Sequence, residues 1–364
     1  MGKIVSAPSG SCWQRGVYTL TAPSYLPTRM VFGPGALEIL PDVLKDVLSS
    51  TGATRIVLIT GRQSAEKPWQ EQVRRAVARY PYHVIVSPKT NPTLASVAAV
   101  ASQCGPPGGE LFVALGGGSV IDTTKSVAAM IGSERSIGEL LRDPTGMRAA
   151  PMIAIPTTAG SGSEVTPTAT LWDDSEARKF SLAGPALFPR AAIVDPDVTL
   201  SLPPDQVAAT GLDALAQAVE GAWAVGASEE SAGFALAAAE RLYAHLVRRH
   251  RDPADAERRA QVSLGALLAG IAIAHSRTTA AHAISYPLTA RWGVPHGHAC
   301  ALSLGALLRF NASLGVADCQ DLRGPDHVTR VINRLVTALH ATGTEQAAAH
   351  LDSLVPLLGL RRFQ

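Results

Sequence analysis

The segment LFVALGGGSVIDTTKSVA, residues 111–128, has the pattern of a buried strand, a glycine turn and a helix. Three consecutive glycines follow the apolar run and precede helically spaced apolar side chains. Glycines let a ligand approach the backbone closely, and the free N–H groups at a helix start attract phosphate oxygens. The spacing is not that of the GxGxxG fingerprint, so a plain tight turn is the alternative. The candidate cofactor-binding residues of this segment are Gly116, Gly117, Gly118, Ser119 and Asp122.

Strand and helix patterns alternate on both sides of this segment. Apolar, β-branched runs at residues 55–61 and 152–156 read as strands, and residues 66–80 and 94–102 have helical spacing. This alternation predicts an α/β domain of the Rossmann-like, dinucleotide-binding kind, with a parallel sheet covered by helices on both faces. Ligands of such domains bind beyond the carboxyl ends of the strands. Residues 1–27, rich in Ser, Pro and Gly, are expected to form a loose arm.

Two further loops follow predicted strands and carry groups suited to a nucleotide. The candidate contacts in them are Gly61, Arg62, Ser64, Thr157, Thr158 and Ser161. The hydroxyl-rich loop after the strand at 152–156 reads equally as a simple polar loop. No acidic residue follows Gly61 directly, so nothing there binds both ribose hydroxyls and repels a 2′-phosphate. NADPH is therefore expected to be accepted beside NADH, unless Glu66 supplies the ribose carboxylate.

The strand pattern stops near Leu200, and the rest of the chain reads as Ala- and Leu-rich helices. Paired prolines at 203 and 204 mark the change, and 364 residues are enough for two separate cores. We predict an α/β nucleotide-binding domain at residues 1–200 and an all-α metal-binding domain at residues 201–364.

Composition excludes several classes of function. A formal net charge of +2, with 17% charged residues and no long basic run, gives no electrostatic footprint for nucleic acid. Charged residues interrupt every apolar stretch before it is long enough to span a membrane. The four cysteines have no paired spacing, and no apolar signal core is visible, which favours the cytoplasm. The expected partner is a small molecule.

The segment AHAISYPLTARWGVPHGH has the features of half a metal site. Its His282 and His296 are fourteen positions apart, which on one unbroken helix is about 21 Å. We expect Pro287 and the Gly293–Pro295 turn to break the helix, so that both imidazoles reach one point. Asp213 is a carboxylate in an apolar helical stretch, and burying its charge costs free energy unless a partner neutralises it. Either histidine alone reads as a hydrogen-bonded residue, but the three together suit Zn²⁺ or Fe²⁺ with one position left for a substrate.

These motifs together resemble the iron-containing (group III) alcohol dehydrogenase family over nearly the whole chain. The matching pieces are GGGSVID, PTTAGSGSEVT, DPDVTLSLPPDQVAATGLDAL and HAISYPLTARWGVPHGHA, in the family's order. The resemblance implies a nucleotide-binding domain, a helical domain and a metal ion in the cleft between them. It also implies that Asp213, His282 and His296 are metal ligands and that Gly116 to Ser119 hold the pyrophosphate.

Two positions depart from the family pattern. Gln217 stands where the family commonly has a third histidine ligand, one helical turn after Asp213 and so on the same face. A neutral amide oxygen is a weaker ligand than imidazole, which leaves open both the role of Gln217 and the choice between iron and zinc. Tyr286 stands where the family often has a histidine, and its phenol can donate a hydrogen bond or simply pack.

The same stretches resemble the subgroup of this family that reduces phosphonoacetaldehyde to 2-hydroxyethylphosphonate. A phosphonate dianion calls for a fixed guanidinium, although most cationic side chains only solvate a surface. The candidates, Arg277 first, are Arg277, Arg291 and Lys179.

The reaction that this resemblance implies is hydride transfer from NADPH or NADH to an aldehyde polarised by the metal ion. The proton then arrives through water, Tyr286 or His298. A general alcohol or polyol dehydrogenase, a lyase of the dehydroquinate synthase type and a non-enzymatic nucleotide-binding protein are the alternatives. A homodimer is expected.

Overall fold

The computed structural model describes residues 16–62, 67–88, 91–173 and 178–361, and the chain forms two compact units. The first unit runs to Thr158 and continues with Ser163–Thr199. The second contains Ala159–Gly162 and everything from Leu200 onward. Residues 159–162, in the loop between β6 (Met152–Pro156) and β7 (Thr168–Asp173), thus belong to the second unit.

The first unit is built on a seven-stranded sheet in the order β1-β2-β9-β6-β5-β3-β4. Its strands are β1 (Tyr18–Leu20), β2 (Arg29–Phe32), β3 (Arg55–Gly61), β4 (Tyr82–Ser87), β5 (Glu110–Gly116), β6 (Met152–Pro156) and β9 (Ala191–Val194). All neighbours are parallel except β1 and β2, so the expected parallel sheet is confirmed, with one antiparallel strand at its edge. The loose arm expected for residues 1–27 is wrong for β1, because these residues pair with β2.

Helices cover both faces of this sheet, as the alternation of patterns predicted. Alternate residues of a strand point to opposite faces. Ile56 and Leu58 of β3 therefore pack in one core cluster with α1 (Leu40–Thr51) and α2 (Pro68–Val77). On the other face, the second core cluster joins the sheet to α3 (Leu94–Ala101), α4 (Gly118–Ser133) and α5 (Ile137–Arg142). Single-turn 3₁₀ helices occur at Ala36–Ile39, Ser163–Val165, Pro185–Leu187 and Pro196–Thr199.

An antiparallel hairpin of β7 (Thr168–Asp173) and β8 (Arg178–Ala183), which the sequence patterns did not predict, lies beside α4. Its first strand is anchored by the fully buried Lys125, whose Nζ donates hydrogen bonds to Thr166 O at 2.6 Å and Thr168 O at 2.8 Å. The carboxylate of Asp122 accepts the Thr170 N–H at 3.0 Å. Two polar side chains of α4 thus anchor one part of β7, and a single parallel bridge joins its Trp172 to Thr93.

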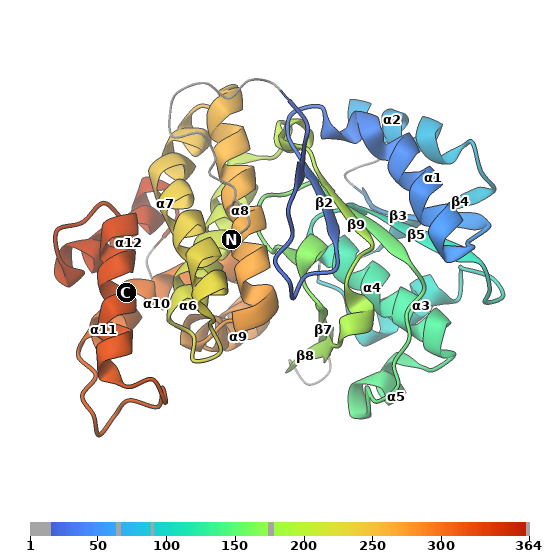
Figure 1. Ribbon diagram of the computed structural model, residues 1–364. Helices are drawn as coiled ribbons and strands as arrows, with labels where there is room; N and C mark the ends of the chain where they lie inside the picture. The colour runs from blue at the N-terminus through green and yellow to red at the C-terminus, as the bar shows by residue number, and fades with distance from the viewer. Residues whose placement is uncertain (1–15, 63–66, 89–90, 174–177, 362–364) are drawn as a thin grey trace. The chain divides into compact units, whose positions relative to one another are not determined.

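The described part of the second unit contains helices and no strand, as the sequence predicted. The helices are α6 (Pro204–Trp223), α7 (Glu229–Arg251), α8 (Ala256–Ser276), α9 (Ala280–Trp292), α10 (His296–Ala312), α11 (Pro325–Ala338) and α12 (Thr344–Leu357). Helices α6, α7 and α8 pack on one another, and α10 packs against α6, α9 and α12 (Figure 1). No described helix has the length and apolar character needed to cross a membrane.

The break between the two predicted histidine ligands is at the turn and not at the proline. Pro287 lies inside α9, so the expectation that it breaks the helix is wrong. A proline removes one helical hydrogen bond and bends a helix, and here α9 continues beyond it. The helix ends at Gly293, whose φ of 66° only glycine adopts at low cost, and α10 begins at His296. His282 in the first turn of α9 and His296 at the start of α10 are thereby free to approach each other.

Candidate metal centre

Three helices of the second unit bring four potential metal ligands together. Asp213 comes from α6, His282 from α9, and both His296 and Cys300 from the first turns of α10. One ligand atom from each of these residues lies within 4.8 Å of all the others. The structure thus brings together the three side chains that the sequence singled out, and adds a cysteine that it did not.

The spacing of these atoms fits the coordination sphere of a single ion. Asp213 Oδ1 is 3.4 Å from His282 Nε2 and 3.9 Å from His296 Nε2, and Cys300 Sγ is 3.9 Å from His296 Nε2. Oxygen and nitrogen ligands about 2.0–2.1 Å from a tetrahedral Zn²⁺ are about 3.4 Å apart. The two nitrogen–oxygen separations exceed ordinary hydrogen-bond lengths, and they agree to within about half an ångström with ligands that face one ion.

Hydrogen bonds on the far side of each imidazole orient both rings. The His282 Nδ1 contacts Oε2 of the fully buried Glu220, and the His296 Nδ1 is 3.2 Å from Ser285 Oγ. Each ring therefore turns its Nε2 toward the cluster, the arrangement by which carboxylates and hydroxyls fix metal-binding histidines. Glu220 also accepts the Ala281 N–H at 2.7 Å and the Thr279 hydroxyl at 2.8 Å, which fixes the start of α9.

Sequence reasoning missed Glu220 and Cys300, although each has a spacing signal. Glu220 is seven residues after Asp213, on the same face of α6. Cys300 is four residues after His296, on the same face of α10. Cys300 was considered only as one of four cysteines without paired spacing, and Glu220 was not singled out.

Burial and close approach shift the pKa values of the ionisable groups in and beside this cluster. Burial alone lowers the pKa of His282, but Cys300, Asp213 and Glu220 together raise that pKa well above its usual value. Burial raises the pKa of Cys300, whereas His282 and His296 lower it, to about 7. The pKa of Glu220 is lowered, because His282 and Thr279 outweigh the effect of its burial. The anionic groups that raise the pKa of His282 converge on one place, where they would also attract a dication.

The other predicted groups near the metal differ in their placement. The Tyr286 ring is stacked on His296, with 6.2 Å between ring centroids, so the phenol adjoins the cluster. The Nε2 of His298 is 2.8 Å from Arg361 O, and His298 is not one of the four clustered residues. Gln217 donates from Nε2 to Ser161 O at 3.2 Å, while its buried Oε1 has no hydrogen-bond partner in the part of the chain that is described.

The three cations proposed to hold a phosphonate lie outside this cluster. Arg277 and Arg291 are exposed in the second unit, and Lys179 is a half-buried residue of β8 in the first unit. Arg277 caps the C-terminus of α8 with a φ of 64° and a ψ of −179°, a backbone conformation that residues other than glycine rarely adopt. Arg277 precedes His282 by five residues, and Arg291 precedes His296 by the same number.

The predicted nucleotide loops meet at one edge of the sheet in the first unit. Strand order reverses between β3 and β5, which is the point where α/β sheets bind their ligands. Gly116 at the end of β5 pairs with Pro156, and its carbonyl accepts the Thr157 N–H at 3.0 Å. A Cβ at Gly116 would lie 2.5 Å from the side chain of Val120, so only glycine allows this turn into α4.

The first N–H groups of α4 receive no side-chain cap, because the N-cap residue is Gly117. The loop of Gly116 to Ser119 lies beside Thr157 and Thr158 at the N-terminus of α4, the kind of place where a helix binds an anion. Asp122, in contrast, accepts hydrogen bonds from Ser163 Oγ and Thr170 N. Gly61 and Arg62 end β3 on the same edge, Ser161 belongs to the second unit, and Ser64 and Glu66 lie outside the described residues.

Comparison with known proteins agrees with both halves of this description. Residues 27–196 match the profile of iron-containing alcohol dehydrogenases, and residues 207–361 match the C-terminal region of the Fe-containing alcohol dehydrogenase family. The chain belongs to this family. Membership confirms that it is an oxidoreductase of the alcohol dehydrogenase and aldehyde reductase type, and with the four-residue cluster it confirms the expected nicotinamide and divalent-metal cofactors.

Individual relatives extend the comparison. The chain is 36% identical over 323 residues to a phosphonoacetaldehyde reductase of Streptomyces viridochromogenes, covering 85% of this chain and 80% of that protein. A sulfoacetaldehyde reductase of Bifidobacterium kashiwanohense, solved in complex with NAD⁺, superimposes with a TM-score of 0.81 at 30% identity, covering 94% and 87% of the two chains. An iron-containing alcohol dehydrogenase of Thermococcus thioreducens gives a TM-score of 0.80 at 26% identity, covering 92% and 86%.

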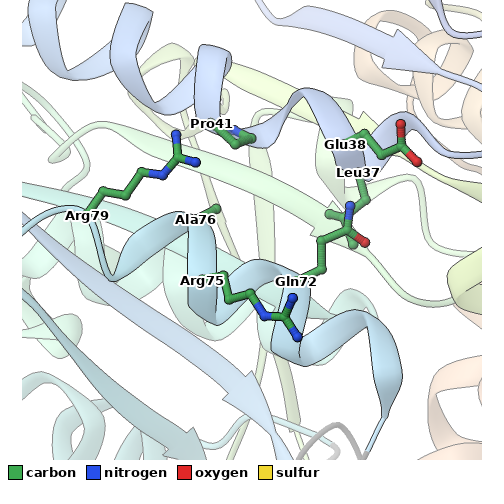
Figure 2. Close-up of a pocket in the computed structure, with 7 residues that line it drawn as sticks. All are labelled: Leu37, Glu38, Pro41, Gln72, Arg75, Ala76 and Arg79. Carbon is green, nitrogen blue, oxygen red and sulfur yellow. The ribbon is translucent and has the colours of Figure 1, made fainter.

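A separate pocket lies in the first unit and is lined by none of the predicted site residues. Figure 2 shows it between the start of α1 and the outer side of α2. Its lining residues are Leu37, Glu38, Pro41, Gln72, Arg75, Ala76 and Arg79. The guanidinium of Arg75 is already paired with Glu71 at 3.0 Å, and the lining mixes both signs of charge. None of its lining residues belongs to the metal cluster or to the nucleotide loops.

Replacing Glu220 tests the support of the metal centre. Glu220→Gln is expected to weaken metal binding about 10- to 100-fold, because His282 loses the carboxylate that orients its ring. Titration with a metal-sensitive dye measures the affinity. Glu229→Gln, which alters an exposed carboxylate paired with Arg334, is the matched control and should bind metal as the unaltered protein does. Equal affinity in the two variants would show that Glu220 has no such role.

Proposed function

We propose that this chain reduces phosphonoacetaldehyde to 2-hydroxyethylphosphonate with NADPH or NADH. The observation that carries the proposal is the 36% identity to a phosphonoacetaldehyde reductase over 85% of the chain. The sulfoacetaldehyde reductase with the similar fold supports it from a second direction. Both names describe a two-carbon aldehyde with a tetrahedral anionic group on the neighbouring carbon, so the common chemistry is an aldehyde beside a fixed anion.

The two units are proposed to divide the work. Residues 1–200 are assigned to the nucleotide, with Gly116 to Ser119 at the pyrophosphate, and residues 201–364 to the metal ion. When bound, the ion supplies a Lewis acid and the nicotinamide supplies hydride. Asp213, His282 and His296 hold the ion, and the amide oxygen of Gln217 is available as a weak further donor.

The proton for the product alcohol is assigned to Tyr286 or to water. The stacking of Tyr286 on His296 supports this, because it keeps the phenol beside a metal ligand. His298 is the weaker candidate, since its Nε2 already contacts the Arg361 carbonyl. In this assignment His298 anchors the C-terminal residues of the second unit to α10.

Arg277 is proposed to bind the phosphonate. Its positive φ has a backbone cost of about 1–3 kcal/mol, and such cost is found most often where a side chain must be held for function. It is two residues before Thr279, whose N–H and hydroxyl are both bonded to Glu220. The segment that carries the guanidinium is thus tied to the carboxylate that orients His282.

Arg277→Ala is expected to lower kcat/KM for phosphonoacetaldehyde roughly 30- to 1000-fold, about 2–4 kcal/mol, because the dianion loses its partner. The kcat/KM for propanal, a neutral aldehyde, should change little. Arg277→Lys should recover part of the loss, since an ammonium lacks the bidentate geometry of a guanidinium.

Two control variants separate the guanidinium from the backbone and from general surface charge. Arg277→Gly removes the guanidinium and relieves the strained φ, so it should lose the same efficiency while unfolding at a higher temperature than Arg277→Ala. Arg291→Ala removes an exposed arginine of the same unit and should leave both substrates unaffected. If the unaltered protein preferred propanal, the general alcohol dehydrogenase function would replace the phosphonate proposal. A homodimer and a cytoplasmic location stay predictions.

A further inference from the structure

Cys300 is placed as a metal ligand is placed, although sequence reasoning did not consider it. It lies one helical turn after His296 on α10, and side chains four residues apart share a helix face. Cys300 is fully buried, so its sulfur faces the protein interior and not solvent. Its Sγ is 3.9 Å from His296 Nε2 and within 4.8 Å of the ligand atoms of Asp213 and His282.

The 3.9 Å between Cys300 Sγ and His296 Nε2 is long for a hydrogen bond to sulfur, and it also suits two donors that face one ion. In a tetrahedral zinc site with Zn–N near 2.0 Å and Zn–S near 2.3 Å, nitrogen and sulfur are about 3.5 Å apart. The observed 3.9 Å is about 0.4 Å longer than that value, so a shift of the two side chains by a few tenths of an ångström would bring both atoms to one ion. The same helix therefore offers an imidazole and a thiol to one point.

The other described cysteines have different surroundings. Cys104 Sγ donates to the Val100 carbonyl at 3.5 Å, one helical turn back, and Cys319 Sγ donates to the Asp321 carbonyl at 3.7 Å. Those are the ordinary acceptors of a thiol in a helix or turn. Cys300 Sγ instead faces the side chains of His282 and His296, with His296 Nε2 at 3.9 Å. Its environment is that of a donor to a metal and not that of a structural thiol.

Gln217 makes a poor fourth donor by comparison. It is a neutral amide, and its Nε2 is committed to the Ser161 carbonyl, which restricts how the group can turn. We infer that Cys300 Sγ is the fourth donor of the metal centre, and that this sulfur makes the centre prefer Zn²⁺ to Fe²⁺. The inference rests on the proposed metal centre of Asp213, His282 and His296. Thiolate favours the softer Zn²⁺, and four protein donors leave a substrate the fifth position that zinc sites can provide.

Cobalt substitution tests the ligand directly, without using activity. The full-length protein is stripped of metal and loaded with Co²⁺, and its near-ultraviolet spectrum is examined for the sulfur-to-cobalt charge-transfer band. The unaltered protein and the control Cys319→Ser should both show the band. Cys300→Ser, which is nearly isosteric, should lack it while still binding Co²⁺ through the remaining donors. Circular dichroism checks that each variant is folded.

Competition between Zn²⁺ and Fe²⁺ under anaerobic conditions tests the preference. Cys300→Ser should lower the ratio of Zn²⁺ to Fe²⁺ affinity by about tenfold or more, because oxygen replaces the donor that favours zinc. If the unaltered protein bound one equivalent of Co²⁺ but showed no sulfur-to-cobalt charge-transfer band, the inference about Cys300 would be overturned. The proposed metal centre of Asp213, His282 and His296 would stand. No Co²⁺ binding by the folded, unaltered protein would overturn both. An unchanged affinity ratio in Cys300→Ser would overturn the zinc preference.

Discussion

His282→Ala is expected to lose its bound metal and to reduce aldehydes about 10³-fold or more slowly, while remaining folded. The change removes the Nε2 that lies 3.4 Å from Asp213 Oδ1. This nitrogen is the proposed metal donor that α9 contributes to the cluster. The loss of turnover is large because the electrostatic stabilisation supplied by a bound metal ion acts directly on the reacting oxygen. Elemental analysis of the purified protein and the steady-state consumption of NADPH or NADH measure the two effects.

The fold should survive because Glu220 keeps its other partners. Its carboxylate still accepts the Ala281 N–H and the Thr279 hydroxyl when the imidazole is gone. The matched control is His275→Ala, which removes an exposed histidine of α8 and should keep full metal and full activity. If His282→Ala retained both metal content and turnover, the assignment of the metal centre would be wrong.

Gly297→Ala is expected to damage the metal centre without altering any ligand. A Cβ at residue 297 would lie 2.0 Å from the Ala209 carbonyl and 2.6 Å from the Asp213 backbone nitrogen. Both contacts are backbone atoms of α6, so α10 must move away from α6. That movement separates His296 from Asp213. We expect at least about a 100-fold loss of metal affinity, and a loss of about 1–3 kcal/mol in the free energy of unfolding from the overpacking.

The control for this variant is Gly233→Ala in α7. No heavy atom lies within 4 Å of a Cβ built at residue 233. The same chemical change there should raise the free energy of unfolding by roughly 0.5–1 kcal/mol, because alanine favours a helix, and should leave metal binding unchanged. Chemical denaturation and metal titration of the two variants make the comparison. If Gly297→Ala bound metal and resisted denaturant as the unaltered protein does, the contact of α6 with α10 would have room for a Cβ, and the prediction would be wrong.

Local patterns in the sequence were enough for the class of fold. The long apolar runs of β3, β5 and β6, separated by helical spacing, specify a parallel sheet because both of its faces must be buried. The short β1 and the β7–β8 hairpin were not predicted. Edge and hairpin strands of this kind contain polar residues and few β-branched ones, and their pairing depends on partners elsewhere in the chain.

The sequence by itself determined which side chains are chemically able to bind a metal or a phosphate. Asp213, His282 and His296 were named from residue type, and the glycine run at 116–118 from its place between a strand and a helix. Only the tertiary structure decided which groups surround these candidates. It placed Cys300 within the cluster and Glu220 behind His282, and it carried α9 past Pro287 to end at Gly293. The physical reason is that helix packing in three dimensions sets the distances between side chains on different helices, and the spacing of residues along a chain does not.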